Sequence, residues 1–155
     1  MNQMECLYEL RTDPIYGFKA FESNWSCRGF KYEVGRTYTL GARPIMCIEG
    51  FHFCIVPSDC FHYYPVFDST KMAIVVGNCH TLVPKSTAYD MGIDSKCVTN
   101  SITIIEDVTE MVMETAKNYG WSHRFPSFSE DPIFNCELHL YLQRTLKVKG
   151  LLYDN

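Results

Sequence analysis

Two short segments that combine glycine with aromatic residues constrain the fold of this chain more than any other feature. The first runs from Cys27 to Gly35 and the second from Gly50 to Cys54. Aromatic residues at every second position are typical of strands, and glycine beside them permits a turn or a close backbone approach. Phe51 and Phe53 would face one side of a strand and His52 the other. Neither segment is a catalytic signature, so both indicate a type of domain rather than a reaction.

Similar patterns predict further strands along the chain. The expected strands cover residues 7–10, 17–21, 31–40, 48–56, 71–76, 79–83, 97–108, 134–142 and 145–153. The segment 97–108 is the clearest, because β-branched residues dominate it. The segment 31–40 is either one half-buried strand or two strands bent at Gly35, and 79–83 would return beside 71–76. The last two strands would form a terminal hairpin.

Two helices are expected between these strands. Ser58 is a suitable N-cap for a brief helix that ends by Pro65, and Thr109 would begin a longer helix that ends at Gly120. Residues 81–94 are polar and irregular, so we expect a surface loop there. The predicted fold is a β-rich α+β single domain with an antiparallel or mixed sheet, which could be barrel-like, and with one short and one longer helix.

The composition of the 155-residue chain fits one globular domain. Hydrophobic residues make up 46% and charged residues 21%, which argues against disorder. The net charge is −4 and the basic residues are scattered, so nucleic acid is not an expected partner. The first residues do not resemble a signal peptide, and no apolar stretch reaches the length of a membrane span. We therefore expect a protein that is not secreted and has no membrane span.

The eight cysteines are spread over the whole chain without any Cys-x-x-Cys pair. A disulfide framework would need a secretory context, so most of them are interpreted as small buried apolar residues. His52, Cys54, Cys60 and His62 fall within eleven residues, but their spacing matches no standard zinc site. We expect no metal and no cofactor. His52 and Cys54 would lie about 7 Å apart on one strand face, too far for a direct bond, and no catalytic residue is assigned.

Several motifs occur in a recognisable order. They read Gly17-Phe18-Lys19-Ala20-Phe21, then Cys27-Arg28-Gly29-Phe30-x-Tyr32-x-Val34-Gly35-x-x-Tyr38, then Gly50-Phe51-His52-Phe53-Cys54, then Tyr63-Tyr64-Pro65, then Asp94-Ser95-Lys96-x-Val98-Thr99-x-x-Ile102-x-Ile104. In this order the chain resembles an uncharacterised small domain of tailed phages, bacteria and large DNA viruses, over about residues 17–108. The resemblance implies a viral or phage origin and hence the cytoplasm of an infected cell, or the virion. Residues 109–155 would form an extension of helix, loop and strand.

Three residues in these motifs are candidates for ligand binding. Arg28 lies beside Gly29, where a backbone can approach closely, and its guanidinium could clamp a phosphate or a carboxylate. An ion pair that pins the loop is the alternative, and Lys96 has the same two interpretations. His52 lies in the second motif and is the third candidate.

Two functions follow from these observations. The first, which we favour, is a non-enzymatic viral protein that acts by protein–protein contact, as a minor virion or capsid-associated component or by binding a host protein. It predicts an apolar patch near residues 111–134, formed with Met111, Met113 and Trp121, and oligomers or assembly. The second is a small enzyme or binding module for a nucleotide-like anion. It predicts a pocket where Arg28, His52 and Lys96 converge.

Overall fold

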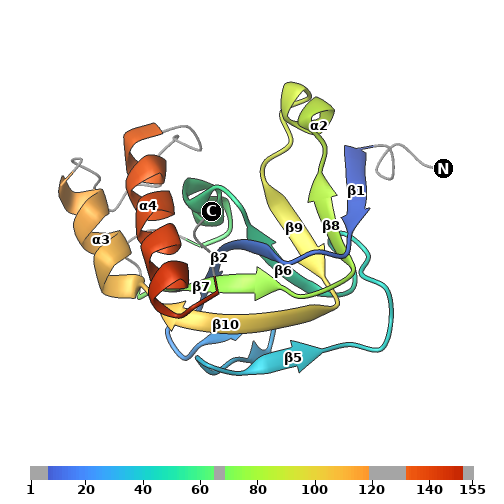
Figure 1. Cartoon of the computed structure of the whole chain (residues 1–155), viewed down its shortest axis with the longest axis horizontal. Helices are drawn as coiled ribbons and strands as arrows, with labels where there is room; N and C mark the ends of the chain where they lie inside the picture. Colours follow the sequence, from blue (N-terminus) through green and yellow to red (C-terminus); the bar gives the residue numbers. More distant parts are fainter. Residues whose placement is uncertain (1–6, 65–68, 119–131, 152–155) are drawn as a thin grey trace.

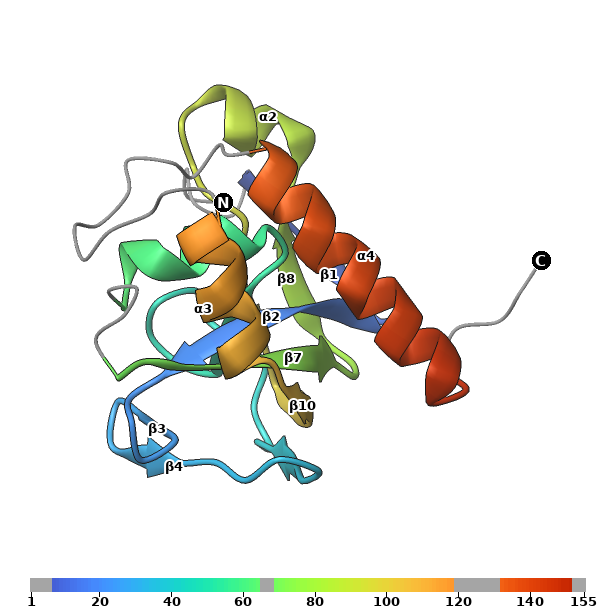
Figure 2. The ribbon, with the colours of Figure 1, turned by 90° about the vertical axis from the view of Figure 1, so that its left-hand side faces the viewer.

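The computed structural model describes residues 7–64, 69–118 and 132–151, and Figures 1 and 2 show it from two directions. Its main element is an eight-stranded sheet in which all neighbouring strands are antiparallel. In spatial order the strands are β1 (Tyr8–Arg11), β8 (Thr81–Pro84), β9 (Lys96–Thr99), β6 (Phe51–Cys54), β2 (Ile15–Phe21), β7 (Lys71–Gly77), β10 (Ser101–Asp107) and β5 (Thr37–Thr39). The β-rich α+β prediction is confirmed, but the sheet is open, since β1 and β5 are its opposite edges.

The other elements in the described part of the chain include a small hairpin and four helical segments. The hairpin pairs β3 (Ser26–Cys27) with β4 (Phe30–Lys31), and Figure 2 shows it at the opposite end of the molecule from α2. The helical segments are η1 (Pro57–His62), α2 (Ser86–Asp90), α3 (Thr109–Asn118) and α4 (Pro132–Val148). Helices α3 and α4 contact each other and stand side by side at one end of the sheet (Figure 1). In the described part of the chain, no helix is long and apolar enough to cross a membrane.

The predicted terminal hairpin is wrong, because helix α4 occupies 132–148. Its buried apolar side chains recur every four residues, at Phe134, Leu138, Leu142 and Leu146. That spacing sets them on one helical face, which packs onto the sheet. The period of these apolar residues is that of a helix and not of a strand.

The long strand predicted over 97–108 is two strands with different neighbours. Strand β9 pairs with β6 and β8, whereas β10 pairs with β7 and β5, and the change occurs at Asn100. Both halves favour β structure, so the sequence shows no sign of the change of partner. Strand β8 likewise pairs with β1 and β9 rather than returning beside β7. The loop predicted over 81–94 is wrong, since it contains β8 and α2.

The segment 31–40 matches neither of its two expected forms. Strand β4 ends at Lys31, no strand is formed over residues 32–36, and β5 begins at Thr37 in the other sheet. Gly35, in the turn between them, has a φ of 91°. The helix predicted at Ser58 is a 3-10 helix that begins at Pro57, without a side-chain cap; Ser58 instead hydrogen-bonds Asn135 of α4. Helix α3 begins at Thr109 as predicted, and its predicted end at Gly120 lies outside the described residues.

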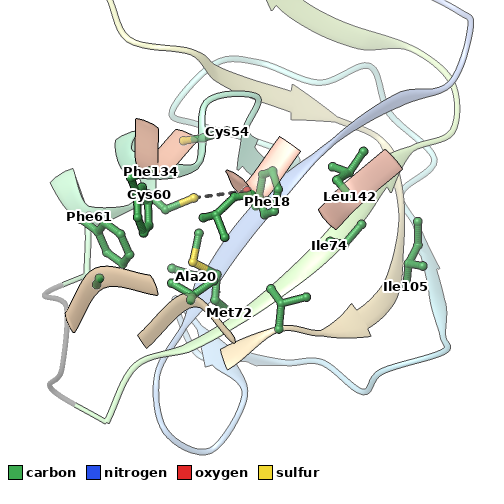
Figure 3. Close-up of a cluster of buried hydrophobic side chains, with 14 of the residues drawn as sticks. Phe18, Ala20, Cys54, Cys60, Phe61, Met72, Ile74, Ile105, Phe134 and Leu142 are labelled. Atoms are coloured by element: carbon green, nitrogen blue, oxygen red, sulfur yellow. Dashed lines mark hydrogen bonds between the residues drawn. The ribbon is translucent and has the colours of Figure 1, made fainter. Parts of the chain in front are cut away.

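The core lies on both faces of the sheet. One cluster, shown in Figure 3, joins Phe18, Met72 and Ile74 of the central strands to Phe61 of η1 and Leu142 of α4. The other face carries a second buried cluster of mainly aromatic and β-branched side chains, among them Phe21, Tyr32, Phe51, Phe53 and Ile104. Met111 and Met113 are partly buried against the first cluster, which limits their share in an exposed apolar patch.

Strand β2 approaches β6 very closely at Gly17. A Cβ atom added there would lie 2.6 Å from the Cys54 carbonyl oxygen and 2.7 Å from a ring carbon of Phe53. Real Cβ atoms do not make such contacts with backbone, so glycine permits the two strands to meet here. The two strands share one register pair, Phe18 with Cys54.

We predict that Gly17→Ala destabilises the protein by about 1–3 kcal/mol, the usual effect of overpacking a core. Urea unfolding measures the change. Gly41→Ala is the matched control, because nothing lies within 4 Å of a Cβ at Gly41. It should change the free energy of unfolding by less than about 0.5 kcal/mol. Equal effects of both substitutions would contradict the close approach.

Candidate functional site

A cavity of about 290 Å³ lies where β2 and β6 diverge. The register of Phe18 with Cys54, if continued, would set Ala20 opposite His52, but β2 and β6 form no further pair. The cavity is walled by these two strands, by the β3–β4 turn, by η1 and the residues after it, and by the start of β9. This volume is at the lower end for small-molecule sites, which suits a compact ligand.

All three ligand-binding candidates from the sequence, Arg28, His52 and Lys96, line this cavity. The fold brings them together from three elements that are far apart in the chain. Besides Arg28 and Lys96, Lys19 of β2 is a further cation that lines the cavity. It lies in the first of the sequence motifs, Gly17–Phe21, but was not among the predicted ligand-binding residues. None of the described residues that line the cavity is acidic.

Arg28 occupies a strained position in the turn of the β3–β4 hairpin. Cys27 pairs with Phe30, so Arg28 and Gly29 form a two-residue loop, and their φ angles are 52° and 78°. Hairpin turns with two positive φ angles favour Asn, Asp or Gly, and a residue with a longer side chain costs about 1–3 kcal/mol there. Arg28 is exposed and makes no ion pair within the described residues. The structural ion pair considered above is therefore not supported.

Lys96 is held by a thiol and an aromatic ring. Its Nζ donates to Sγ of Cys47 at 3.1 Å and lies 4.7 Å from the ring centroid of Tyr63. The Tyr63 hydroxyl donates to Asp94 at 2.6 Å, and burial together with this carboxylate raises the pKa of Tyr63. Tyr63 therefore stays protonated and neutral beside Lys96.

His52 lines the cavity but is held by backbone groups. Its Nε2 accepts the amide of Cys47 at 2.9 Å, so a proton on Nδ1 is the consistent neutral tautomer. Burial, followed by the positive charges of Lys19, Lys96 and Arg28, lowers the pKa of His52 to about 3. The imidazole is thus neutral at physiological pH. It positions Cys47, whose φ is 65°, and through Cys47 it positions Lys96.

Lys19 is the deepest cation of the site, with 4% of its surface exposed. Its Nζ donates to the His52 carbonyl at 2.6 Å, the group left without a β2 partner where the strands separate, and to Sγ of Cys27 at 3.7 Å. The ring centroids of Phe21 and Tyr32 lie 5.5 and 5.4 Å away. Burial lowers the pKa of Lys19. A lysine inside an otherwise apolar strand was the sequence signal for this residue.

Three thiols complete the cavity wall. Sγ of Cys27 accepts the Tyr64 hydroxyl at 3.2 Å, and Cys60 donates to the Phe18 carbonyl at 3.4 Å (Figure 3). The neighbouring Cys60 and burial raise the pKa of Cys54 well above its ordinary value, so it remains a thiol. Of the seven described cysteines, Cys54, Cys60 and Cys97 are buried, Cys27 and Cys79 are half-buried, and Cys47 and Cys136 are exposed. The interpretation that most cysteines are buried therefore holds for fewer than half of those described.

Of the four residues that were weighed as metal ligands, His52, Cys54 and Cys60 line the cavity and His62 does not. His62 contacts Asp94 at 3.1 Å, away from the Cys60 sulfur, which faces Phe18. In residues 7–64, 69–118 and 132–151, no group of three or more His, Cys, Asp or Glu side chains is placed to hold a metal ion.

Comparison with known proteins gives one match. A family model described as "Domain of unknown function (DUF7666)" matches residues 15–116, which include every pocket-lining residue but exclude α4. No curated protein and no solved structure matches the chain. The geometry of the pocket is therefore the basis for any functional conclusion.

The low pKa of His52 predicts a pH-dependent contribution to stability. Because the folded pKa, about 3, is below the ordinary 6.5, the unfolded chain takes up the proton first. The contribution is fully present above pH 6.5 and is lost as the pH falls towards 3. We expect the stability difference between the wild type and His52→Gln to shrink from neutral pH to about pH 4, by on the order of 2–3 kcal/mol. Urea titrations at each pH measure it, and a constant difference would contradict a neutral, buried imidazole.

Proposed function

The chain belongs to the family described as a domain of unknown function (DUF7666), and we propose that it binds a small, nucleotide-like anion in the cavity between β2 and β6. One observation carries the proposal. Lys19, Arg28 and Lys96 line a single cavity that has no acidic lining residue. In a chain of net charge −4, such a concentration of positive charge is unexpected unless it serves a ligand.

The cations raise the electrostatic energy of the empty cavity. After burial, their charges are the next causes of the low pKa of His52, so a further positive charge is disfavoured in the cavity. An anion would reverse that repulsion and would be attracted most strongly where the protein excludes water. Arg28, which is strained and without an ion pair among the described residues, is the side chain best placed to form a bidentate contact with a phosphate or carboxylate.

The uncharged part of the cavity wall suits a flat or apolar group. Phe53, Tyr63 and Tyr64 provide aromatic surface, and Phe18 and Ala20 provide apolar surface. Aromatic side chains beside a cationic patch are the combination that proteins use for ligands with both a ring and a charged group. This supports a mononucleotide or a molecule of similar chemistry.

The contact function that we favoured from the sequence receives less support. Its expected apolar patch spans 111–134, and residues 119–131, with Trp121, lie outside the described part of the chain. Met111 and Met113 are partly buried in the core. A viral structural protein or host protein as partner, oligomer formation and a viral origin stay predictions.

We predict that Arg28→Asn and Lys96→Met each weaken the binding of AMP by about tenfold or more, the value of a charged hydrogen bond. Isothermal titration calorimetry with AMP, adenosine and inorganic phosphate measures the effect. Adenosine should bind more weakly than AMP to the wild type and should lose little with either substitution.

The substitution Arg28→Asn distinguishes an effect on ligand binding from an effect on folding. Asn tolerates the positive φ of Arg28, so Arg28→Asn should leave the thermal stability unchanged or slightly higher. Lys117→Met, on the exposed side of α3, is the control for lost charge and should bind AMP like the wild type. Equal affinity of all variants, or no binding of any of the three probes at millimolar concentration, would refute the proposal.

A further inference from the structure

We infer that Lys19 captures a carbonyl-bearing anionic ligand covalently, as an imine, with Arg28 and Lys96 holding the anionic group. This inference depends on the anion-binding function proposed above. It names the class of ligand more narrowly, as an anion that also carries an aldehyde or a ketone.

The position of Lys19 differs from that of a structural lysine. Buried lysines are usually paired with a carboxylate, but within the described residues Lys19 Nζ donates to a backbone carbonyl and to a thiol. Lys19 is 4% exposed and nevertheless lines the cavity. A ligand that enters the cavity therefore meets a lysine that is shielded from bulk water.

The surroundings of Lys19 favour loss of a proton from its ammonium group. Its Nζ donates to the His52 carbonyl and to Cys27 Sγ and lies over the rings of Phe21 and Tyr32, and no carboxylate is among its hydrogen-bond partners in the described residues. Burial lowers the pKa of Lys19, so this ammonium gives up its proton more readily than that of an exposed lysine. The neutral amine formed in this way has a lone pair free to react.

The reaction balances without an oxidant or a metal. The nitrogen lone pair attacks the carbonyl carbon, and the former carbonyl oxygen takes up a proton that the nitrogen loses, which gives a carbinolamine. Loss of the hydroxyl with the remaining nitrogen proton, as water, gives the imine. The Tyr64 hydroxyl donates to Cys27 Sγ at 3.2 Å, the same sulfur that Lys19 contacts, so a phenolic proton donor lies beside the amine. Burial raises the pKa of Tyr64, which keeps this proton in place.

If the role of Lys19 is purely structural, the expected reactivity of its amine is the opposite. If Lys19 only satisfies the His52 carbonyl where the strands separate, it should be among the least reactive lysines of the folded protein, because it is almost fully buried. If it captures carbonyl ligands, it should be among the most reactive.

The test uses pyridoxal 5′-phosphate, an aromatic aldehyde that carries a phosphate. The native protein is incubated with less than one equivalent at neutral pH, reduced with borohydride to fix imines, and mapped by peptide mass spectrometry. We expect about tenfold or more adduct at Lys19 than at the exposed Lys117 or Lys149, because exposed lysines are almost wholly protonated at neutral pH. Adducts at Lys117 and Lys149 with none at Lys19 would overturn the inference.

Further variants and probes test imine formation at Lys19 and anion binding independently of each other. Arg28→Asn should lower the adduct at Lys19 and leave that at Lys117 unchanged, and AMP should protect Lys19. Lys19→Met keeps the length of the side chain and should lose that adduct alone. If AMP binds to the wild type but Lys19 is never labelled, the imine is refuted and the anion site stands. If uncharged pyridoxal labels Lys19 as well as its phosphate does, the anionic ligand class and the proposed anion site are refuted.

Discussion

The separation of β2 from β6 is the constraint on which the rest of the site depends. The two strands meet at Phe18 and Cys54, where Gly17 lets the backbones touch, and beyond this pair they diverge. If β2 and β6 paired beyond Phe18 and Cys54, a backbone amide of β2 would donate a hydrogen bond to the His52 carbonyl. The separation leaves this polar group to a side chain, and burying it without a hydrogen bond would cost about 1–3 kcal/mol. Lys19 supplies that bond.

The electrostatics of the cavity follow from this arrangement. A lysine that reaches between two strands is buried, so its ammonium form loses hydration. Arg28 and Lys96 arrive from the β3–β4 turn and from β9, and their charges add to that of Lys19 in lowering the pKa of His52. Polar groups that would destabilise an ordinary core are here concentrated around an opening of about 290 Å³. Proteins retain such arrangements mainly at binding and catalytic sites.

Local patterns predicted most of the individual strands, but not their partners. Strands β2, β6 and β7 match the expected segments, because alternation and β-branched residues act locally. The segment 97–108 forms two strands because its two halves pair with different neighbouring strands, and no residue in the segment indicates this change of partner. Helix α4 is different, since the four-residue repeat of its buried apolar side chains is present in the sequence and indicates a helix, but the prediction of two strands did not take it into account.

The sequence by itself determined a β-rich α+β domain and marked Arg28, His52 and Lys96 as chemically notable. Residue type and local spacing suffice for both, because they act over a few neighbouring positions. Only the tertiary structure decided that these three residues share one cavity, that His52 is held by backbone groups, and that Lys19 lies beneath them. Such features depend on contacts between segments far apart in the chain, and on a gap in a backbone ladder that no single segment specifies.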